Sequence, residues 1–199
     1  MSHFNHAASS WDSEGKIKFM GELARKAQSH LNISEKIDIL DFGCGTGLFG
    51  LEFADHAKSL LGIDTSTGML EVFDNKTKEH AHINSLNTDL ENEDIDHKFD
   101  LIVSSMTFHH LDDPKSVLAK LRKLLRPNGQ IAIVDLDEED GTFHSDNAKA
   151  GVKHFGFSNT KLSNWAKELE LESNITIIDT VEKNDKSYNQ FLAVFKNLN

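Results

Sequence analysis

The chain has 199 residues, 38% hydrophobic and 27% charged, which is the size and composition of one globular domain and excludes a disordered or fibrous protein. Its formal net charge of -11 sets up a repulsive field for polyphosphates and disfavours nucleic acid as a partner. A single cysteine, Cys44, excludes an internal disulfide and fits a reducing cytoplasm, and no apolar run reaches the ~18 residues of a membrane span.

The first half of the chain alternates between helix and strand patterns. Apolar residues recur every three or four positions over residues 17–31, which predicts an amphipathic helix. Residues 37–42 are largely branched and apolar and are followed by glycines, so they predict a strand buried on both faces. We then expect a helix over residues 47–56, a strand over 59–64, and a helix over 66–78 that Ser66 can cap.

The second half continues this alternation and then departs from it. Strands are predicted over residues 82–86, 99–104 and 130–135, with a helix over 114–125 and a turn at 127–129 before the last of them. A helix over 159–170 is followed by strands at 175–181 and 190–195. Because the polar connection between these two strands is short, they must pair antiparallel.

Together these elements predict an α/β fold of the Rossmann-like, doubly wound type. Its mostly parallel seven-stranded sheet has helices on both faces and ends in a C-terminal antiparallel β-hairpin. We expect one domain over residues 1–199.

A glycine-rich segment, residues 41–47, follows the first predicted strand and opens a helix. Such a loop presents backbone N–H groups with little side-chain bulk, so a ligand can lie directly on it. Asp64 ends the second strand, where a carboxylate can accept hydrogen bonds from both hydroxyls of a ribose. Its alternative role is to cap the next helix, for which Ser66 is already available. The loop and the acid together predict a nucleoside site.

Two nucleoside ligands compete for this site. Residues 45–50 also satisfy the three-glycine dinucleotide pattern, with Asp64 near the expected distance of about 20 residues. Three features favour S-adenosylmethionine: Asp41 suits a cationic amino acid portion and opposes a pyrophosphate, Gly43 adds a further glycine, and the chain ends in a hairpin. The motif by itself does not decide between them.

With these motifs the sequence resembles the class I S-adenosylmethionine-dependent methyltransferases, within the small-molecule group that includes quinone and sterol methylases (methyltransferase type 11). The resemblance spans about residues 37–135. It implies that the first motif holds the methionine portion, Asp64 the ribose, and Asp89 with Leu90 the adenine, while the fourth strand ends beside the transferred methyl. The cofactor-binding residues expected on this basis are Asp41, Gly43, Cys44, Gly45, Gly47, Asp64, Thr65, Met69, Asp89, Leu90 and Ser104.

The resemblance also divides the domain. Residues 1–35 are expected to form an N-terminal lid and helix, 36–136 the cofactor-binding core, 137–160 a substrate-side loop, and 161–199 the final helix and hairpin. No Asn/Asp-Pro-Pro-aromatic segment follows the fourth strand, which disfavours methylation of a nucleic-acid base. Nor is there a paired-glutamate loop of the protein-arginine type.

Two adjacent histidines after the fourth strand, His109 and His110, are candidate general bases for a hydroxyl or thiol acceptor. Their alternative roles are a structural contact and an exposed side chain. No HExxH segment occurs and the pair lacks i, i+4 spacing, so we expect no metal. The residues expected to shape the acceptor pocket are Trp11, Met106, Phe143, His144, His154 and Phe157.

We therefore expect a methyltransferase that moves a methyl group from S-adenosylmethionine to a small molecule by direct in-line transfer, leaving S-adenosylhomocysteine. We expect no nucleic acid partner and no membrane insertion. The alternatives are an NAD-dependent oxidoreductase using the same glycine loop, and a non-catalytic module that binds S-adenosylmethionine. The sequence leaves the acceptor and the oligomeric state open.

Overall fold

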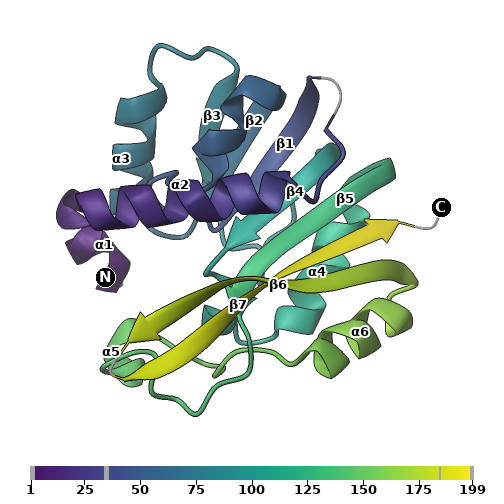
Figure 1. Cartoon of the computed structure of the whole chain (residues 1–199). Coiled ribbons are helices and arrows are strands. Elements are labelled where there is room, and N and C mark those ends of the chain that lie inside the picture. The colour runs from purple at the N-terminus through teal and green to yellow at the C-terminus, as the bar shows by residue number, and fades with distance from the viewer. Residues whose placement is uncertain (1–2, 34–35, 184, 198–199) are drawn as a thin grey trace.

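The computed structural model describes residues 3–33, 36–183 and 185–197 (Figure 1). Seven strands form one sheet in the order β3-β2-β1-β4-β5-β7-β6. Strands β1 to β5 pair in parallel, whereas β7 runs antiparallel to both β5 and β6. This confirms the predicted doubly wound sheet with a C-terminal hairpin. The strands are β1 (Ile37–Phe42), β2 (Ala57–Asp64), β3 (Ile83–Asn87), β4 (Phe99–Ser105), β5 (Leu125–Leu136), β6 (Leu171–Lys183) and β7 (Lys186–Asn197).

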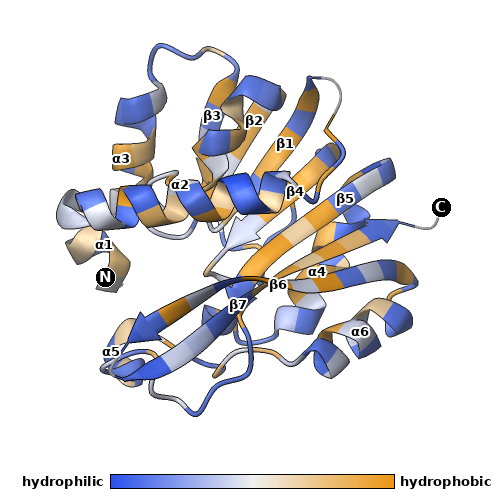
Figure 2. Cartoon of the chain, viewed as in Figure 1, coloured by the Kyte–Doolittle hydropathy of each residue, from blue (hydrophilic) through white to orange (hydrophobic). Residues whose placement is uncertain are grey.

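Helices cover both faces of this sheet because successive residues of its central strands point in opposite directions. In β1, Ile39 belongs to a core with α2 and α3, while Leu40 belongs to a core with α4 and α6. Figure 2 shows apolar residues concentrated along the central strands that separate these two cores. The helical elements are α1 (His3–Ala7), η1 (Ala8–Ser10), α2 (Glu14–Gln28), η2 (Gly50–His56), α3 (Thr67–Thr77), η3 (Phe108–His110), α4 (Pro114–Lys123), α5 (Asn147–Ala150) and α6 (Asn159–Glu168).

Several helix boundaries follow from caps. The Ser66 hydroxyl accepts a hydrogen bond from the Met69 amide and starts α3, as predicted. Helix α2 begins earlier than its apolar pattern, because Ser13 accepts from the Lys16 amide. The helix predicted over residues 47–56 is a shorter 3-10 helix, Gly50–His56.

The predicted turn at residues 127–129 is instead a bulge inside β5. Asn128 has a φ of 64°, and the pairing of β4 with β5 shifts register between Phe99 and Leu101. The strand therefore starts at Leu125 and resumes regular pairing at Gln130. The hairpin strands are also longer than predicted, because polar residues continue their backbone ladder beyond the apolar core.

The order of the strands places a crevice at one edge of the sheet. The chain moves outward from β1 to β2 and β3, then returns to β4 on the other side of β1. In such sheets ligands bind where the order reverses, at the carboxyl ends of the strands. The loops after β1, β2 and β4 all meet there.

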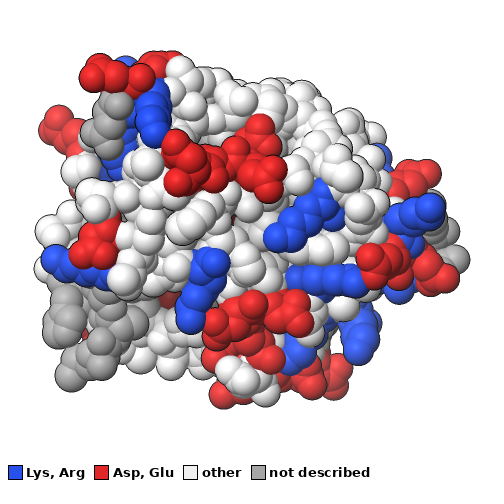
Figure 3. All heavy atoms as spheres, turned by 90° about the horizontal axis from the view of Figure 1, so that it is seen from below, with Lys and Arg blue, Asp and Glu red and all other residues white. Residues whose placement is uncertain are grey.

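No helix among the described residues is long and apolar enough to cross a bilayer. On the face seen in Figure 3, acidic and basic side chains are interspersed.

Candidate functional site

A cavity of about 630 Å³ lies at the carboxyl edge of the parallel strands. Its walls come from the loops that follow β1, β2, β3 and β4, from the N-terminal segment, and from the loop after β5. This is the position that the reversal of strand order predicts for a ligand.

The glycine loop forms one wall of this cavity. Gly43, Gly45 and Gly47 all have positive φ, at 69°, 53° and 84°. A Cβ on Gly43 would overlap the side chain of Thr107, and one on Gly47 would overlap Leu51 and Phe73. A Cβ on Gly45 would meet no atom within 4 Å. The loop is therefore packed on two sides, and its backbone at Gly45 faces open space where a ligand can approach closely.

Asp64 holds this loop in place. Its Oδ2 accepts from the Gly45 amide and its Oδ1 from the Ser66 amide, each at 2.8 Å. Burial raises the pKa of Asp64, although these backbone hydrogen bonds oppose the shift. Each carboxylate oxygen keeps a second lone pair, so Asp64 can still accept from a pair of ligand hydroxyls.

Asp41 is a buried acid that has no counter-ion among the described residues. It is 2% exposed, and its Oδ2 has no hydrogen-bond partner. Burial, followed by the nearby charge of Asp64, raises the pKa of Asp41 to about 8. A hydrogen bond from the Gly50 amide has the opposite, smaller effect on this pKa. A buried carboxylate of this kind favours a cation beside it. The ammonium or sulfonium of S-adenosylmethionine fits this requirement, whereas a pyrophosphate does not.

Most of the other predicted cofactor-binding residues also line the cavity: Cys44, Thr65, Met69, Asp89 and Leu90. Asp89 accepts from the Glu91 amide and from Asn92 Nδ2, so its turn is rigid. Gly47, which packs against Leu51 and Phe73, does not line the cavity, and neither does Ser104. Ser104 is fully buried and donates to the Phe42 carbonyl, and the neighbouring Ser105 faces the cavity instead. Burial raises the pKa of the Cys44 thiol well above its usual range, so Cys44 is no nucleophile.

The N-terminal segment covers the glycine loop and the start of α3. Asn5 Oδ1 accepts from the Ser66 hydroxyl at 2.5 Å and from the Gly68 amide at 3.1 Å. Asp12 accepts from the Thr46 hydroxyl and pairs with Lys76, each at 2.6 Å. Trp11 lines the cavity, with the ammonium of Lys16 3.4 Å from its ring centroid. The predicted lid segment therefore lies over the site.

Three histidines gather on the opposite wall. The ring of His109 lies 4.0 Å from that of His110 and 5.2 Å from that of His144, measured between centroids. His109 Nδ1 lies 2.7 Å from the carboxylate of Asp135, at the end of β5. Asp135 was not predicted as a site residue from the sequence, although its place at a strand end beside the crevice is the signal that also identified Asp64. No group of metal-binding side chains is arranged around an ion site in the described residues.

The predicted acceptor pocket is brought together only in part. Trp11, Met106, Phe143 and His144 line the cavity. The other two lie elsewhere: His154 Nε2 donates to the Leu111 carbonyl, and the Phe157 ring packs against Trp165 in the core beneath α6.

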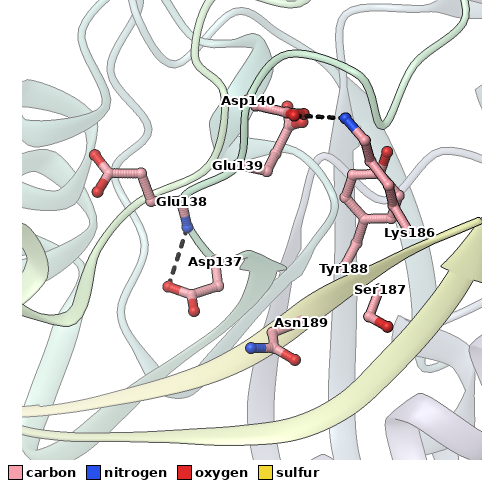
Figure 4. Close-up of a pocket in the computed structure, with 8 residues that line it drawn as sticks. All are labelled: Asp137, Glu138, Glu139, Asp140, Lys186, Ser187, Tyr188 and Asn189. Carbon is pink, nitrogen blue, oxygen red and sulfur yellow. Dashed lines mark hydrogen bonds and ion pairs between the residues drawn. The ribbon is translucent and has the colours of Figure 1, made fainter.

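A second hollow, of about 310 Å³, lies beside the hairpin (Figure 4). It is lined by residues 137–140 and 186–189, and the ammonium of Lys186 lies 2.6 Å from Asp140. It shares no lining residue with the large cavity. Four of its eight lining residues are acids, and among them only Asp140 is paired with its single lysine.

Sequence comparison agrees with this arrangement. Residues 40–131 match the family described as "Methyltransferase domain". An uncharacterized methyltransferase of Schizosaccharomyces pombe is 36% identical over 165 residues, which cover 74% of this chain and 57% of that protein. A ubiquinone biosynthesis O-methyltransferase of Pasteurella multocida is 31% identical over 146 residues, covering 63% of this chain and 58% of that protein. The chain thus spans little more than half the length of these relatives.

Among solved structures, the N-methyltransferase NodS of Bradyrhizobium japonicum in complex with S-adenosylhomocysteine has the same fold. It aligns with a TM-score of 0.68 and 22% identity over 92% of this chain and 87% of NodS. None of these three proteins supports the oxidoreductase alternative. The matched domain and the relatives show that residues 40–131 form a methyltransferase domain, and the sheet order and the likeness to NodS show that its fold is the Rossmann-like fold of class I methyltransferases.

Proposed function

We propose that this protein transfers a methyl group from S-adenosylmethionine to a small-molecule acceptor. The observation that carries the proposal is the buried, unpaired Asp41 beside a glycine loop whose surface is open at Gly45. An acid without a counter-ion favours a cationic ligand, and a bare backbone permits its close approach.

In this proposal the chain's residues bind and orient more than they react. Asp64 accepts from the ribose hydroxyls, Asp41 balances the positive charge, and the turn at Asp89 and Leu90 holds the adenine. The bound sulfonium supplies an already activated methyl group. The cavity walls exclude water and align the acceptor behind the methyl, and such alignment lowers a barrier by roughly 7–11 kcal/mol.

A small acceptor is supported by the cavity and by a relative. The acceptor side is walled by Phe143, His144 and Met106, beneath the N-terminal segment, and this suits a compact molecule better than a polymer. The Pasteurella relative is named for ubiquinone biosynthesis, whose intermediates are small molecules. The net charge of -11 disfavours a nucleic acid. A cytoplasmic location stays a prediction from the sequence.

Calorimetric titration of the purified protein tests the proposal. We expect heat from S-adenosylmethionine and S-adenosylhomocysteine, none from NAD, and binding weakened at least about 10-fold in Asp64→Ala, since hydrogen bonds to charged groups are worth about 1.5–3 kcal/mol. Heat from NAD alone would favour the oxidoreductase. Tight binding with no methyl transfer to any acceptor would favour a non-catalytic module.

A further inference from the structure

The carboxylate of Asp135 fixes the ring of His109 in one orientation. Both side chains are almost fully buried, at 0% and 1% exposed. Asp135 Oδ1 lies 2.7 Å from His109 Nδ1, and Asp135 Oδ2 accepts from the His109 backbone amide at 3.3 Å. Although burial by itself would raise it, hydrogen bonds from His109 and from the Leu136 amide lower the pKa of Asp135. An ionised carboxylate only accepts, so Nδ1 carries the hydrogen.

This arrangement leaves the other ring nitrogen bare. His109 Nε2 is buried and has no hydrogen-bond partner in the part of the chain that the structure describes, while His109 lines the cavity. In the neutral ring with hydrogen on Nδ1, Nε2 holds a lone pair. A buried polar atom without a partner is costly unless a ligand satisfies it. His144 Nδ1, on the neighbouring ring, is likewise buried without a partner.

The two neighbouring histidines differ from His109. His110 Nδ1 donates to the Gly151 carbonyl, which ties it to the chain after α5. Burial is the main cause that lowers the pKa of His110 and of His144, to about 4 in each case. Neither ring has a carboxylate at hydrogen-bond distance, so neither can stabilise an added proton as Asp135 does for His109.

We propose that His109 Nε2 is the general base of this methyltransferase, that Asp135 positions it, and that the acceptor atom is a neutral aromatic hydroxyl. This rests on the proposed function. As the hydroxyl proton moves to Nε2, the oxygen forms a bond to the methyl carbon, the carbon–sulfur bond breaks, and its electron pair neutralises the sulfonium. The imidazolium is balanced by Asp135. The aromatic wall of Phe143, with His144 at its edge, favours a flat ring over an aliphatic alcohol.

The geometry gives the two adjacent histidines, His109 and His110, different roles. His110 packs edge-on against Phe4 of the N-terminal segment, and its proton-bearing nitrogen is directed at the backbone. His110 therefore shapes the pocket, whereas His109 contacts the acceptor.

The test compares His109→Gln and Asp135→Asn with His154→Gln, a control histidine outside the cavity. Each protein is given S-adenosylmethionine with a labelled methyl group and a panel of phenols from unsubstituted phenol to para-nitrophenol. We expect His109→Gln to lower kcat roughly 100-fold or more for phenol with little change in KM, and much less for the readily ionised para-nitrophenol. The control retains its activity. An equal loss across the panel, or none, would overturn the role of His109.

Nitrogen NMR of the histidine rings provides a readout besides activity. In the complex with S-adenosylhomocysteine, His109 should show a protonated Nδ1 and an Nε2 without hydrogen. Asp135→Asn should change this tautomer and shift the pH dependence of phenol methylation. The charged or titratable groups around the pair are His110 from η3, His144 and Glu139 from the loop after β5, and Lys183 from the end of β6. A proton on Nε2 in the unaltered protein at neutral pH would overturn the proposal.

Binding separates this inference from the proposed function. If S-adenosylhomocysteine binds to the unaltered protein and no phenol is methylated, the hydroxyl class is wrong. If S-adenosylhomocysteine does not bind at all, the proposed function itself fails.

Discussion

Replacing Gly45 by alanine isolates the one position where the glycine loop is open to a ligand. The added methyl group meets no protein atom within 4 Å, so the only cost to folding is a left-handed backbone at φ 53°. For a non-glycine residue this costs roughly 1–2 kcal/mol. In a chain of this size each kcal/mol lowers the melting temperature by about 2–4 °C.

Gly151→Ala is a matched control. Gly151 has φ 73°, also has nothing within 4 Å of its added Cβ, and does not line the cavity. Both variants should therefore lose similar stability, but only Gly45→Ala places a methyl group where we expect the cofactor to lie. Overfilling a packed site costs about 1–3 kcal/mol, which corresponds to a roughly 5- to 150-fold weaker affinity for S-adenosylhomocysteine.

Thermal unfolding by circular dichroism and calorimetric titration measure the two effects separately. Unchanged affinity in Gly45→Ala would show that the ligand does not lie on this part of the loop. An equal loss of affinity in both variants would show that backbone strain, and not contact, is responsible.

Three further variants test the buried acid, the lid segment and the core. Because the folded protein raises the pKa of Asp41 to about 8, it holds this proton more tightly than the unfolded chain. Ligand-free protein should therefore lose up to about 1.4 kcal/mol of stability per pH unit as the pH rises from about 5 to about 8. Urea unfolding of Asp41→Asn should lack this pH-dependent loss. A pH-independent difference in stability between the two proteins would contradict the raised pKa of Asp41. Asp12→Ala removes the contacts of the N-terminal segment with Thr46 and Lys76. In stopped-flow measurements S-adenosylhomocysteine should dissociate from this variant about 10-fold faster than from the control Glu172→Ala. Equal dissociation rates would show that the N-terminal segment does not help to retain the ligand. Leu118→Ala in the core should lower the free energy of unfolding in urea by about 2–5 kcal/mol. Ile17→Ala, at a residue that is 49% exposed, should lower it by less than about 0.5 kcal/mol. Similar losses in the two variants would refute the assigned cores.

Local patterns were sufficient to predict the order of elements. A short apolar run ending in glycines predicted β1 with its observed bounds, Ile37–Phe42, because strands buried on both faces have few alternatives. Ser66 was recognised as a cap because capping depends on residues only three apart in the chain. The bulge at residues 127–129 was missed, since proline, asparagine and glycine are equally typical of a turn, and only pairing with β4 distinguishes the two.

The site residues that lie close together in the sequence could be predicted, whereas contacts between distant segments could not. Asp41 and Asp64 lie at the carboxyl ends of β1 and β2, so the general rule for parallel sheets located them. The hydrogen bond between His109 and Asp135 joins positions 26 residues apart, and no local pattern predicts it. The sequence likewise placed Phe157 in the pocket with Phe143, yet Phe157 turns into the core against Trp165. Aromatic residues suit both environments, and only tertiary packing decides between them.

A crystal structure of the complex with S-adenosylhomocysteine is the most direct measurement of where this protein binds its ligand. We predict that the ribose hydroxyls lie within hydrogen-bond distance of Asp64, that the amino acid portion passes over Gly45 with its ammonium toward Asp41, and that the adenine meets the turn at Asp89 and Leu90. Ligand density away from the loop between β1 and η2, or a ribose without contact to Asp64, would contradict the account.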